Sequence, residues 1–170
     1  MRAAGHGRIL VSTSSAGLHG LHGLSAYAAS KAALIGLART LAAEGAARDV
    51  YCNAIAPYAA TRMTDAHLGA AAREAMSPAH VVPLVAALVD PRCRVNGEVI
   101  VVGLGWARRA TSVEIGPLVP VASYALQEER ATTGHLRVAG VCAEFPDALQ
   151  AFADFERAAA GGLAGATSQG

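Results

Sequence analysis

The order of apolar and mixed segments in the first hundred residues predicts a parallel α/β sheet. Short, mainly apolar runs at 8–12, 49–56 and 99–102 have the length and composition of buried strands. The segment 26–47 instead carries apolar residues at three- and four-residue spacing, which is typical of a helix, and a second helix is expected over 77–89 from its start signal. Strands and helices therefore alternate, as expected for a parallel sheet with right-handed crossovers.

Cap and turn residues set the expected ends of these elements. Ser25 is expected to cap the first long helix, and Pro57 is expected to stop the second strand. Ser77 followed by Pro78 has the cap-then-proline pattern of a helix start, and Gly103 ends the third strand.

The remaining sequence gives a weaker pattern. Residues 61–75 are polar and alanine-rich and are expected to form a surface helix. We expect a first domain over 1–106, an extension over 107–160 that ends in a docking helix, and a disordered tail over 161–170. The docking helix is expected to begin at Phe145-Pro146-Asp147, with an apolar face formed by Leu149, Phe152 and Phe155.

The number of predicted strands is small for such a sheet. Doubly wound sheets usually carry about five or more strands, whereas three are predicted here. The first predicted strand begins at Arg8, so at least one edge of the sheet is expected to lack its neighbour. An unpaired apolar strand favours association with another segment or chain.

Composition narrows the classes of function. Hydrophobic residues make up 53% of the chain but aromatic residues only 5%, so the core must consist of Ala, Val, Leu and Ile. The net charge is +1 without a basic run, which argues against nucleic-acid binding. No apolar stretch has the length of a membrane span, and no signal-peptide core follows Met1. The three cysteines show no metal or redox spacing and indicate reduced thiols in a cytoplasmic protein.

Lys31 is the only lysine among the 14 lysine and arginine residues. It lies one helical turn after Tyr27, so both side chains are expected on one face of the predicted helix. A phenol in water ionises near about pH 10, and a nearby ammonium favours the phenolate. The pair suits a proton-transferring group that works at neutral pH, and the alternative is an ordinary surface lysine.

Ser14 is a candidate for contact with the substrate. It follows the first predicted strand, and ligands of open α/β sheets bind beyond the carboxyl ends of the strands. A hydroxyl there can donate to a substrate carbonyl as negative charge develops on the oxygen. Ser12 and Ser15 are rival candidates that spacing alone does not exclude.

These residues occur in the order and at the spacing of a known family. Ser14, then Tyr27-Ala28-Ala29-Ser30-Lys31, then Asn53-Ala54-Ile55-Ala56-Pro57 resemble the short-chain dehydrogenase/reductase family. The resemblance implies an α/β fold, the C-terminal half of a Rossmann-like doubly wound parallel sheet. It also implies NAD or NADP as cofactor and a small hydroxy or keto compound as substrate.

The resemblance also implies a role for each matching residue. Tyr27 would be the catalytic acid/base, and Ser14 would orient and polarise the substrate carbonyl. Lys31 would tune Tyr27 and hold the nicotinamide ribose. The segment from Pro57, with Tyr58 and Ala60, would close over the nicotinamide.

A narrower resemblance covers roughly residues 7–160. The segments 52–57, 61–64 and 103–106, together with the late helix from Phe145, resemble the dehydrogenase domain of peroxisomal type 2 multifunctional β-oxidation enzymes. Members of that branch oxidise 3-hydroxyacyl-CoA thioesters with NAD.

Two departures from the family pattern affect the cofactor site. Tyr58 stands where the family usually has glycine, a change that the multifunctional branch shares. The glycine-rich phosphate-binding turn and the ribose-reading acid should precede Ser14, and neither is present. The N-terminal dinucleotide-binding half is therefore expected to be absent, and the chain is expected to bind NAD or NADP poorly.

Several other residues have plain interpretations. His19 and His22 lie in a repeated Gly-Leu-His without nearby carboxylates or thiols, so no metal site is predicted. Asp49 is expected to be a solvated charge at a helix end. Arg108 and its neighbour Arg109 are expected to be surface residues rather than ligands of a CoA phosphate. Trp106 lines an acyl pocket or simply packs, and the sequence does not decide between these.

The resemblance thus implies an NAD(P)-dependent oxidoreductase acting on a hydroxy or keto substrate, with a 3-hydroxyacyl thioester as the narrower expectation. We expect this chain to be weakly active or inactive alone. The alternative is a non-catalytic interaction subunit that pairs through its open sheet edge. Neither nucleic acid nor a membrane is an expected partner. We expect a homo-oligomer, which in this family usually pairs through the helix bearing Tyr27, or pairing with a missing N-terminal half.

Overall fold

The computed structural model describes residues 1–61, 69–115 and 142–143. The chain divides into two compact units, Met1–Thr111 and Ser112–Gly170. The first unit holds a four-stranded sheet in the order β1–β2–β3–β4, formed by β1 (Gly7–Ser12), β2 (Val50–Tyr58), β3 (Val99–Gly103) and β4 (Trp106–Ala110). In the second unit, β5 (Glu114–Ile115) pairs antiparallel with β6 (Cys142–Ala143). The expected helix from Phe145 and the expected tail over 161–170 lie outside the described residues.

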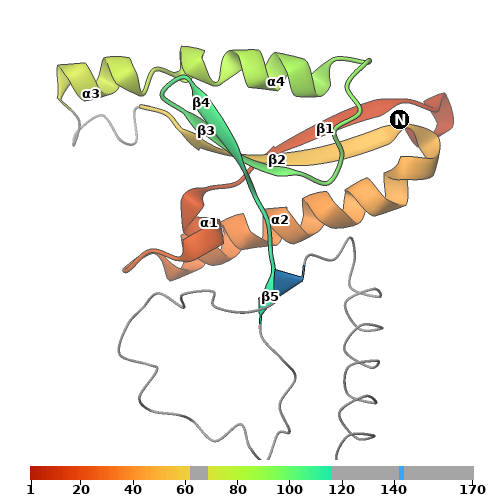
Figure 1. Cartoon of the computed structure of the whole chain (residues 1–170), viewed down its shortest axis with the longest axis horizontal. Helices are drawn as coiled ribbons and strands as arrows, with labels where there is room; N and C mark the ends of the chain where they lie inside the picture. Colours follow the sequence, from red (N-terminus) through yellow and green to blue (C-terminus); the bar gives the residue numbers. More distant parts are fainter. Residues whose placement is uncertain (62–68, 116–141, 144–170) are drawn as a thin grey trace, which may run out of the picture. The chain divides into compact units, whose positions relative to one another are not determined.

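The predicted α/β fold class is confirmed. Strands β1, β2 and β3 are parallel, and β4 returns antiparallel to β3. Helix α2 covers one face of the sheet and α4 covers the other (Figure 1). The helices are α1 (Ser15–His19), α2 (Ser25–Gly45), α3 (Ala70–Ala75) and α4 (Val82–Val89), with 3-10 turns at Arg2–Ala4, Ala46–Arg48 and Pro78–His80.

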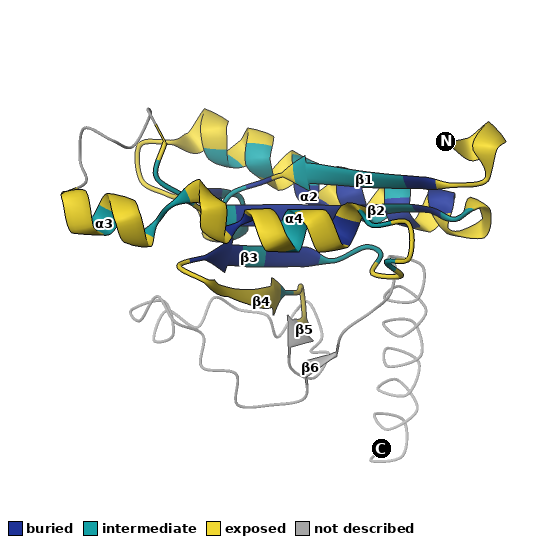
Figure 2. Ribbon diagram, turned by 90° about the horizontal axis from the view of Figure 1, so that it is seen from above, coloured by how far each residue is buried: buried dark blue, intermediate teal, exposed yellow. Residues whose placement is uncertain are grey.

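Each face of the sheet has its own apolar core, and the strands between the helices are the most buried part of the unit (Figure 2). On the α2 face, Ile35, Ala38 and Ala42 pack against Cys52, Ala54 and Val99. On the α4 face, Val81 and Leu88 pack against Ile55, Ile100 and Val102. Successive side chains of a strand point to opposite faces, which is why continuous apolar runs suit these strands.

Strand β2 continues through Pro57, contrary to the prediction that this proline stops it. Thr13 donates its backbone N–H to Ile55, so the polar backbone groups of Ile55 and Pro57 point toward β1. The next bond of that ladder would need an N–H on Pro57, and β1 ends at Ser12. On its other side β2 stays paired, with Pro57 opposite Val102. The proline therefore ends the β1–β2 pairing and not the strand.

Three further local features differ from the predictions. Ser25 does not cap α2, because the N-cap position is Leu24 and no side chain bonds there. The segment after Ser14 contains the short helix α1, which the sequence pattern did not predict. Strand β4 was not predicted from the sequence. The two-residue turn Leu104–Gly105 joins it to β3, and both residues of the turn have a positive φ (56° and 80°). Ser77 does cap the turn that leads into α4, as predicted.

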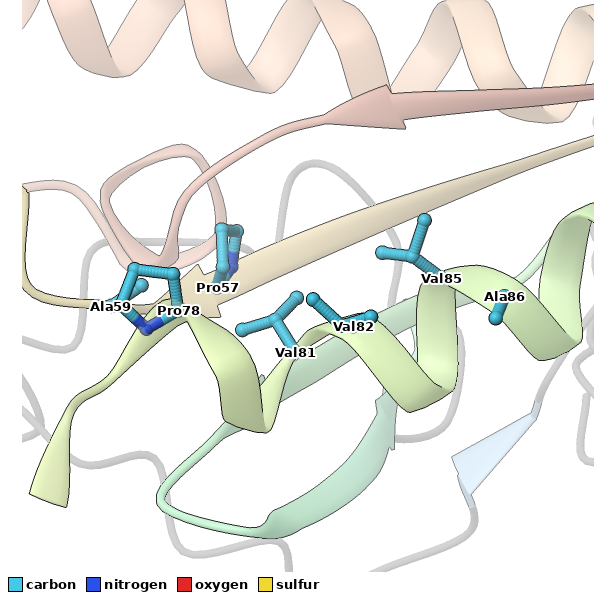
Figure 3. A pocket seen from close by; sticks show the side chains of 7 residues that line it. All are labelled: Pro57, Ala59, Pro78, Val81, Val82, Val85 and Ala86. Atoms are coloured by element: carbon cyan, nitrogen blue, oxygen red, sulfur yellow. The ribbon is translucent and has the colours of Figure 1, made fainter.

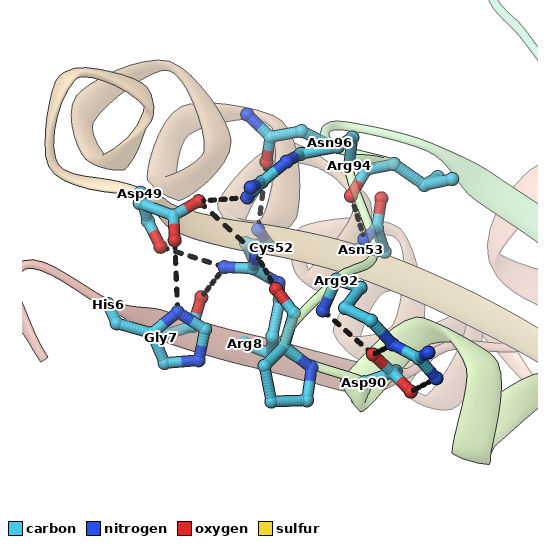
Figure 4. A network of polar contacts seen from close by, with 12 residues as sticks. His6, Gly7, Arg8, Asp49, Cys52, Asn53, Asp90, Arg92, Arg94 and Asn96 are labelled. Carbon is cyan, nitrogen blue, oxygen red and sulfur yellow. Dashed lines mark hydrogen bonds and ion pairs between the residues drawn. The ribbon is translucent and has the colours of Figure 1, made fainter.

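A polar cluster closes the amino ends of β1 and β2 (Figure 4). Asp49 accepts hydrogen bonds from Arg8 (3.2 Å) and Arg94 (2.9 Å), and it contacts Nδ1 of His6 (3.0 Å). These contacts, the one with His6 foremost, lower the pKa of Asp49. The Arg8 side chain is only 3% exposed and stacks on the ring of Tyr51 at 4.3 Å. Asp49 lies at a helix end as expected and is 34% exposed, but it is also the centre of a cluster of basic side chains, which the sequence did not predict.

None of the helices described is long and apolar enough to cross a membrane. In the same part of the chain, no group of three or more His, Cys, Asp or Glu side chains is arranged to hold a metal ion.

Candidate functional site

The carboxyl ends of the three parallel strands meet at one edge of the sheet. β1 ends at Ser12, β2 at Tyr58 and β3 at Gly103. The chain returns to this edge at the start of α2, which runs back toward the amino ends of the strands and finishes with Gly45 against Val50. The first turns of α2 therefore lie where ligands of open α/β sheets bind.

The structure brings Tyr27 and Lys31 together at this edge. The ammonium of Lys31 donates a hydrogen bond to the backbone carbonyl of Ser12 (2.9 Å) and lies 5.7 Å from the centre of the Tyr27 ring. Tyr27 is 41% exposed, so its phenol is accessible to a ligand. An ammonium has three donors, and the bond to Ser12 uses one of them. Lys31 can therefore fix its own position and still donate to a second molecule.

Two residues that were not singled out in the sequence hold α2 against β1. Thr13 is 3% exposed and donates its hydroxyl to the backbone carbonyl of Lys31 (2.6 Å). Gly17 in α1 lies against the backbone of α2, because a Cβ on it would be 2.7 Å from the carbonyl carbon of Lys31. The available signal was the run Ser12-Thr13-Ser14-Ser15-Ala16-Gly17, whose small and hydroxyl residues permit this close approach.

Ser14 follows β1 directly and caps α1. Its Oγ accepts a hydrogen bond from the backbone N–H of Ala16 (3.2 Å). A serine hydroxyl also carries one donor hydrogen, which this contact leaves available for a substrate oxygen. Among its rivals, Ser12 shares the strand parity of Leu10, which packs on the α4 face, and so points away from α2. Ser15 is the first residue of α1.

The residues expected near the nicotinamide lie at the end of β2. Pro57 and Tyr58 are its last two residues, and Tyr58 is 41% exposed. Ala60 follows, and its backbone N–H is already donated to the carbonyl of Met76 (2.7 Å). Tyr58 and the two remaining donors of Lys31 are therefore available to a ligand at this edge, whereas the Ala60 N–H is not. The described β-to-α connections contain no glycine-rich turn that fits the pyrophosphate.

Asn53, part of the matching motif, has a structural role in the described unit. It is 1% exposed, donates to the carbonyl of Val95 (2.8 Å) and accepts from the N–H of Glu98 (3.0 Å). Asn96 in the same segment accepts from Cys52 and donates to Ala42. These amides fix the entry to β3 and hence the register of the sheet.

An apolar hollow of about 390 Å³ lies on the other face of the sheet (Figure 3). It is formed by α4 and the end of β2, and its lining consists of Pro57, Ala59, Pro78, Val81, Val82, Val85 and Ala86. None of these residues carries a titratable or nucleophilic group. The hollow is thus separate from the Tyr27–Lys31 pair and offers no chemistry of its own.

Comparisons with known proteins agree with this geometry. Residues 1–72 match the family model described as short chain dehydrogenase. The chain is therefore similar to the short-chain dehydrogenase/reductase family over the residues that carry Ser14, Tyr27 and Lys31. It is 42% identical over 106 residues to peroxisomal multifunctional enzyme type 2 of Mus musculus, covering 62% of this chain and 14% of that protein.

Two solved structures of this family extend the likeness to three dimensions. Full-length peroxisomal multifunctional enzyme type 2 from Drosophila melanogaster has a TM-score of 0.62 at 34% identity, over 70% of this chain and 21% of that chain. A protein from Beutenbergia cavernae described as an NAD(P)-dependent gluconate 5-dehydrogenase, with bound NADP, has a TM-score of 0.53 at 38% identity, over 62% of this chain and 48% of that one. The chain thus spans less than half of each of these proteins.

Proposed function

We propose that this chain is a short-chain dehydrogenase/reductase that moves a hydride between NAD or NADP and a hydroxy or keto substrate, with a 3-hydroxyacyl thioester as the substrate class. The supporting observation is the position of Lys31, bonded to the last carbonyl of β1 and close to the Tyr27 ring. A lysine held in this way presents a fixed positive charge beside a phenol at the edge where substrates of such sheets bind.

Each residue then has one task. In the oxidation, Tyr27 accepts the proton of the substrate hydroxyl; in the reduction, it returns that proton to the oxygen. Ser14 donates its hydroxyl hydrogen to the same oxygen, and Lys31 stabilises the phenolate by its charge. When bound, NAD(P) accepts or supplies the hydride. The described residues would hold only its nicotinamide end, so we propose that the chain alone binds the cofactor weakly.

The test is a hydride-transfer assay on the full chain with a saturating nicotinamide cofactor and a 3-oxoacyl thioester. Tyr27→Phe is expected to lower turnover by about a hundredfold or more, because general acid–base catalysis contributes about 10²–10⁴. Tyr51→Phe is the matched control, since that ring stacks on Arg8 at the amino end of β2. Turnover of Tyr27→Phe equal to the wild type, with both variants folded, would refute the assignment.

A second candidate function rests on the outer edge of β1. The backbone N–H groups of Gly7 and Thr13 donate hydrogen bonds to β2 and its entry. Because backbone groups alternate in direction along a strand, the N–H and C=O groups of Arg8 and Leu10 point away from β2. In the described part of the chain no strand pairs with β1 on that side, although helices pack on both its faces. Such an edge accepts a further strand, so an interaction subunit is the competing proposal. Fast amide hydrogen exchange at Leu10 in every oligomeric state would argue against it.

A further inference from the structure

The register of the sheet places an exposed aromatic residue on the same face as the candidate site. Tyr58 lies opposite Gly103, and Gly103 lies opposite Trp106, so the three form one row across β2, β3 and β4. Cys52 and Ala54 of β2 pack on the α2 face, and alternation carries Tyr58 to that face too. Residues on one row of a sheet share a face, so Trp106 also belongs to the α2 face.

This row is open at the carboxyl end of the sheet. Trp106 is 82% exposed and Leu104, in the adjoining turn, is 51% exposed. Position 103, in the middle of the row, has no room for a side chain, because a Cβ on Gly103 would be 2.6 Å from the carbonyl oxygen of Tyr58. The row therefore presents two aromatic side chains with a glycine between them, and it is continuous with the edge that carries Tyr27 and Lys31.

A positive charge accompanies Trp106 on this face. Arg108 lies two residues farther along β4, so the alternation of the strand puts it on the same side as Trp106. Arg109 points to the opposite side, where its guanidinium donates a hydrogen bond to the carboxylate of Glu98 (2.7 Å). In the part of the chain that the structure describes, no ion pair involves Arg108. The end of β4 thus offers an apolar ring next to a cation.

We propose that Trp106, with Leu104 and Arg108, binds the part of the substrate that is remote from the reacting carbon. This inference rests on the proposed function. An apolar chain would lie against Trp106 and Leu104, and an anionic group of the same molecule would approach Arg108. Three strand spacings separate β1 from β4, about 14 Å, so the substrate must be extended and amphiphilic rather than a small hydroxy acid.

The chain contains a single tryptophan, which makes Trp106 an intrinsic probe. The full chain is titrated with 3-oxodecanoyl-pantetheine and with 3-oxobutanoyl-pantetheine while tryptophan emission is recorded, and binding is measured separately by calorimetry. Neither probe contains an adenine that could quench the fluorescence. We expect a saturable blue shift with the long thioester and none with the short one.

Variants of Trp106 test whether this side chain itself contacts the long thioester. Trp106→Ala is expected to weaken binding of the long thioester about tenfold and to leave the short thioester unaffected, while Trp106→Phe retains the preference. Val89→Ala is the control, because Val89 is 43% exposed at the end of α4, on the other face of the sheet. Unchanged emission during calorimetric binding, an unaltered preference in Trp106→Ala, or no binding of the long thioester would each overturn the inference.

The experiments distinguish failure of this inference from failure of the proposed function. If the long thioester shifts the emission of Trp106 but no hydride is transferred, the binding surface stands and the proposed function fails. If hydride transfer occurs with equal efficiency on both thioesters and Trp106→Ala changes nothing, the proposed function stands and this inference fails.

Discussion

Replacement of Gly17 by alanine tests the close contact that holds α1 against α2. Alanine is favoured over glycine inside a helix by about 1 kcal/mol, so propensity alone predicts stabilisation. The added Cβ, however, would lie 2.7 Å from the carbonyl carbon of Lys31 and 2.8 Å from the nitrogen of Ala32. Backbone atoms cannot relieve the contact by a change of rotamer, so the added methyl group overpacks the site, which costs about 1–3 kcal/mol. Taking the middle of that range and subtracting the propensity gain, we expect a net loss of about 1 kcal/mol in the free energy of unfolding.

Gly36 provides the matched control in the same pair of helices. It lies inside α2, and no atom would come within 4 Å of a Cβ placed on it. Gly36→Ala should therefore stabilise the protein by about 1 kcal/mol. Urea unfolding followed by circular dichroism should show opposite shifts of the midpoint, each of roughly 0.5–1 M. If Gly17→Ala is as stable as the wild type, α1 does not approach α2 as closely as described.

Three other outcomes are expected. Leu104→Gly should raise the thermal midpoint, because a left-handed backbone costs a residue with a side chain about 1–2 kcal/mol and Leu104 has φ 56°; a lower midpoint would show that the leucine side chain stabilises the turn. The hydrogen bond with His6, followed by the contacts with Arg8 and Arg94, lowers the pKa of Asp49, and the hydrogen bonds from Arg92 lower the pKa of Asp90 to about 2. Stability should therefore be fully present above about pH 4 and fall as the pH drops toward 2, and Asp49→Asn should flatten this decline in acid unfolding curves. NADH should give no measurable increase in the melting temperature of the full chain, and a clear increase would show that the described residues do not represent its whole cofactor site.

The order of strands and helices could be predicted because each segment carries its own period. The Tyr27–Lys31 pair could be predicted as well, since one helical turn places both on one face. The contacts that fix the pair could not, because they depend on tertiary geometry. The bond from Thr13 to the Lys31 carbonyl and the approach of Gly17 require α1 and α2 to be packed first.

Pro57 and Asp49 show why local rules failed elsewhere. A proline stops a strand only if its missing N–H faces a partner strand. The backbone of Pro57 faces β1, and β1 has already ended at Ser12. Asp49 reads as a helix-end charge in the sequence, but Arg8 and Arg94 reach it from segments more than 40 residues away. Both outcomes follow from neighbours that are distant in sequence.

The candidate site residues lie in one continuous segment of the chain, from β1 through α2 to β2, which bears on how the site could be transferred between genes. Ser14, Tyr27, Lys31 and Tyr58 all lie within one stretch of about fifty consecutive residues, bounded by Gly7 and Tyr58. The two hydrogen bonds that orient Lys31, one that it donates to the Ser12 carbonyl and one that its own carbonyl accepts from Thr13, lie inside the same stretch. Recombination that moves this single segment into another gene would carry the residues proposed to transfer the proton together with the hydrogen bonds that hold them.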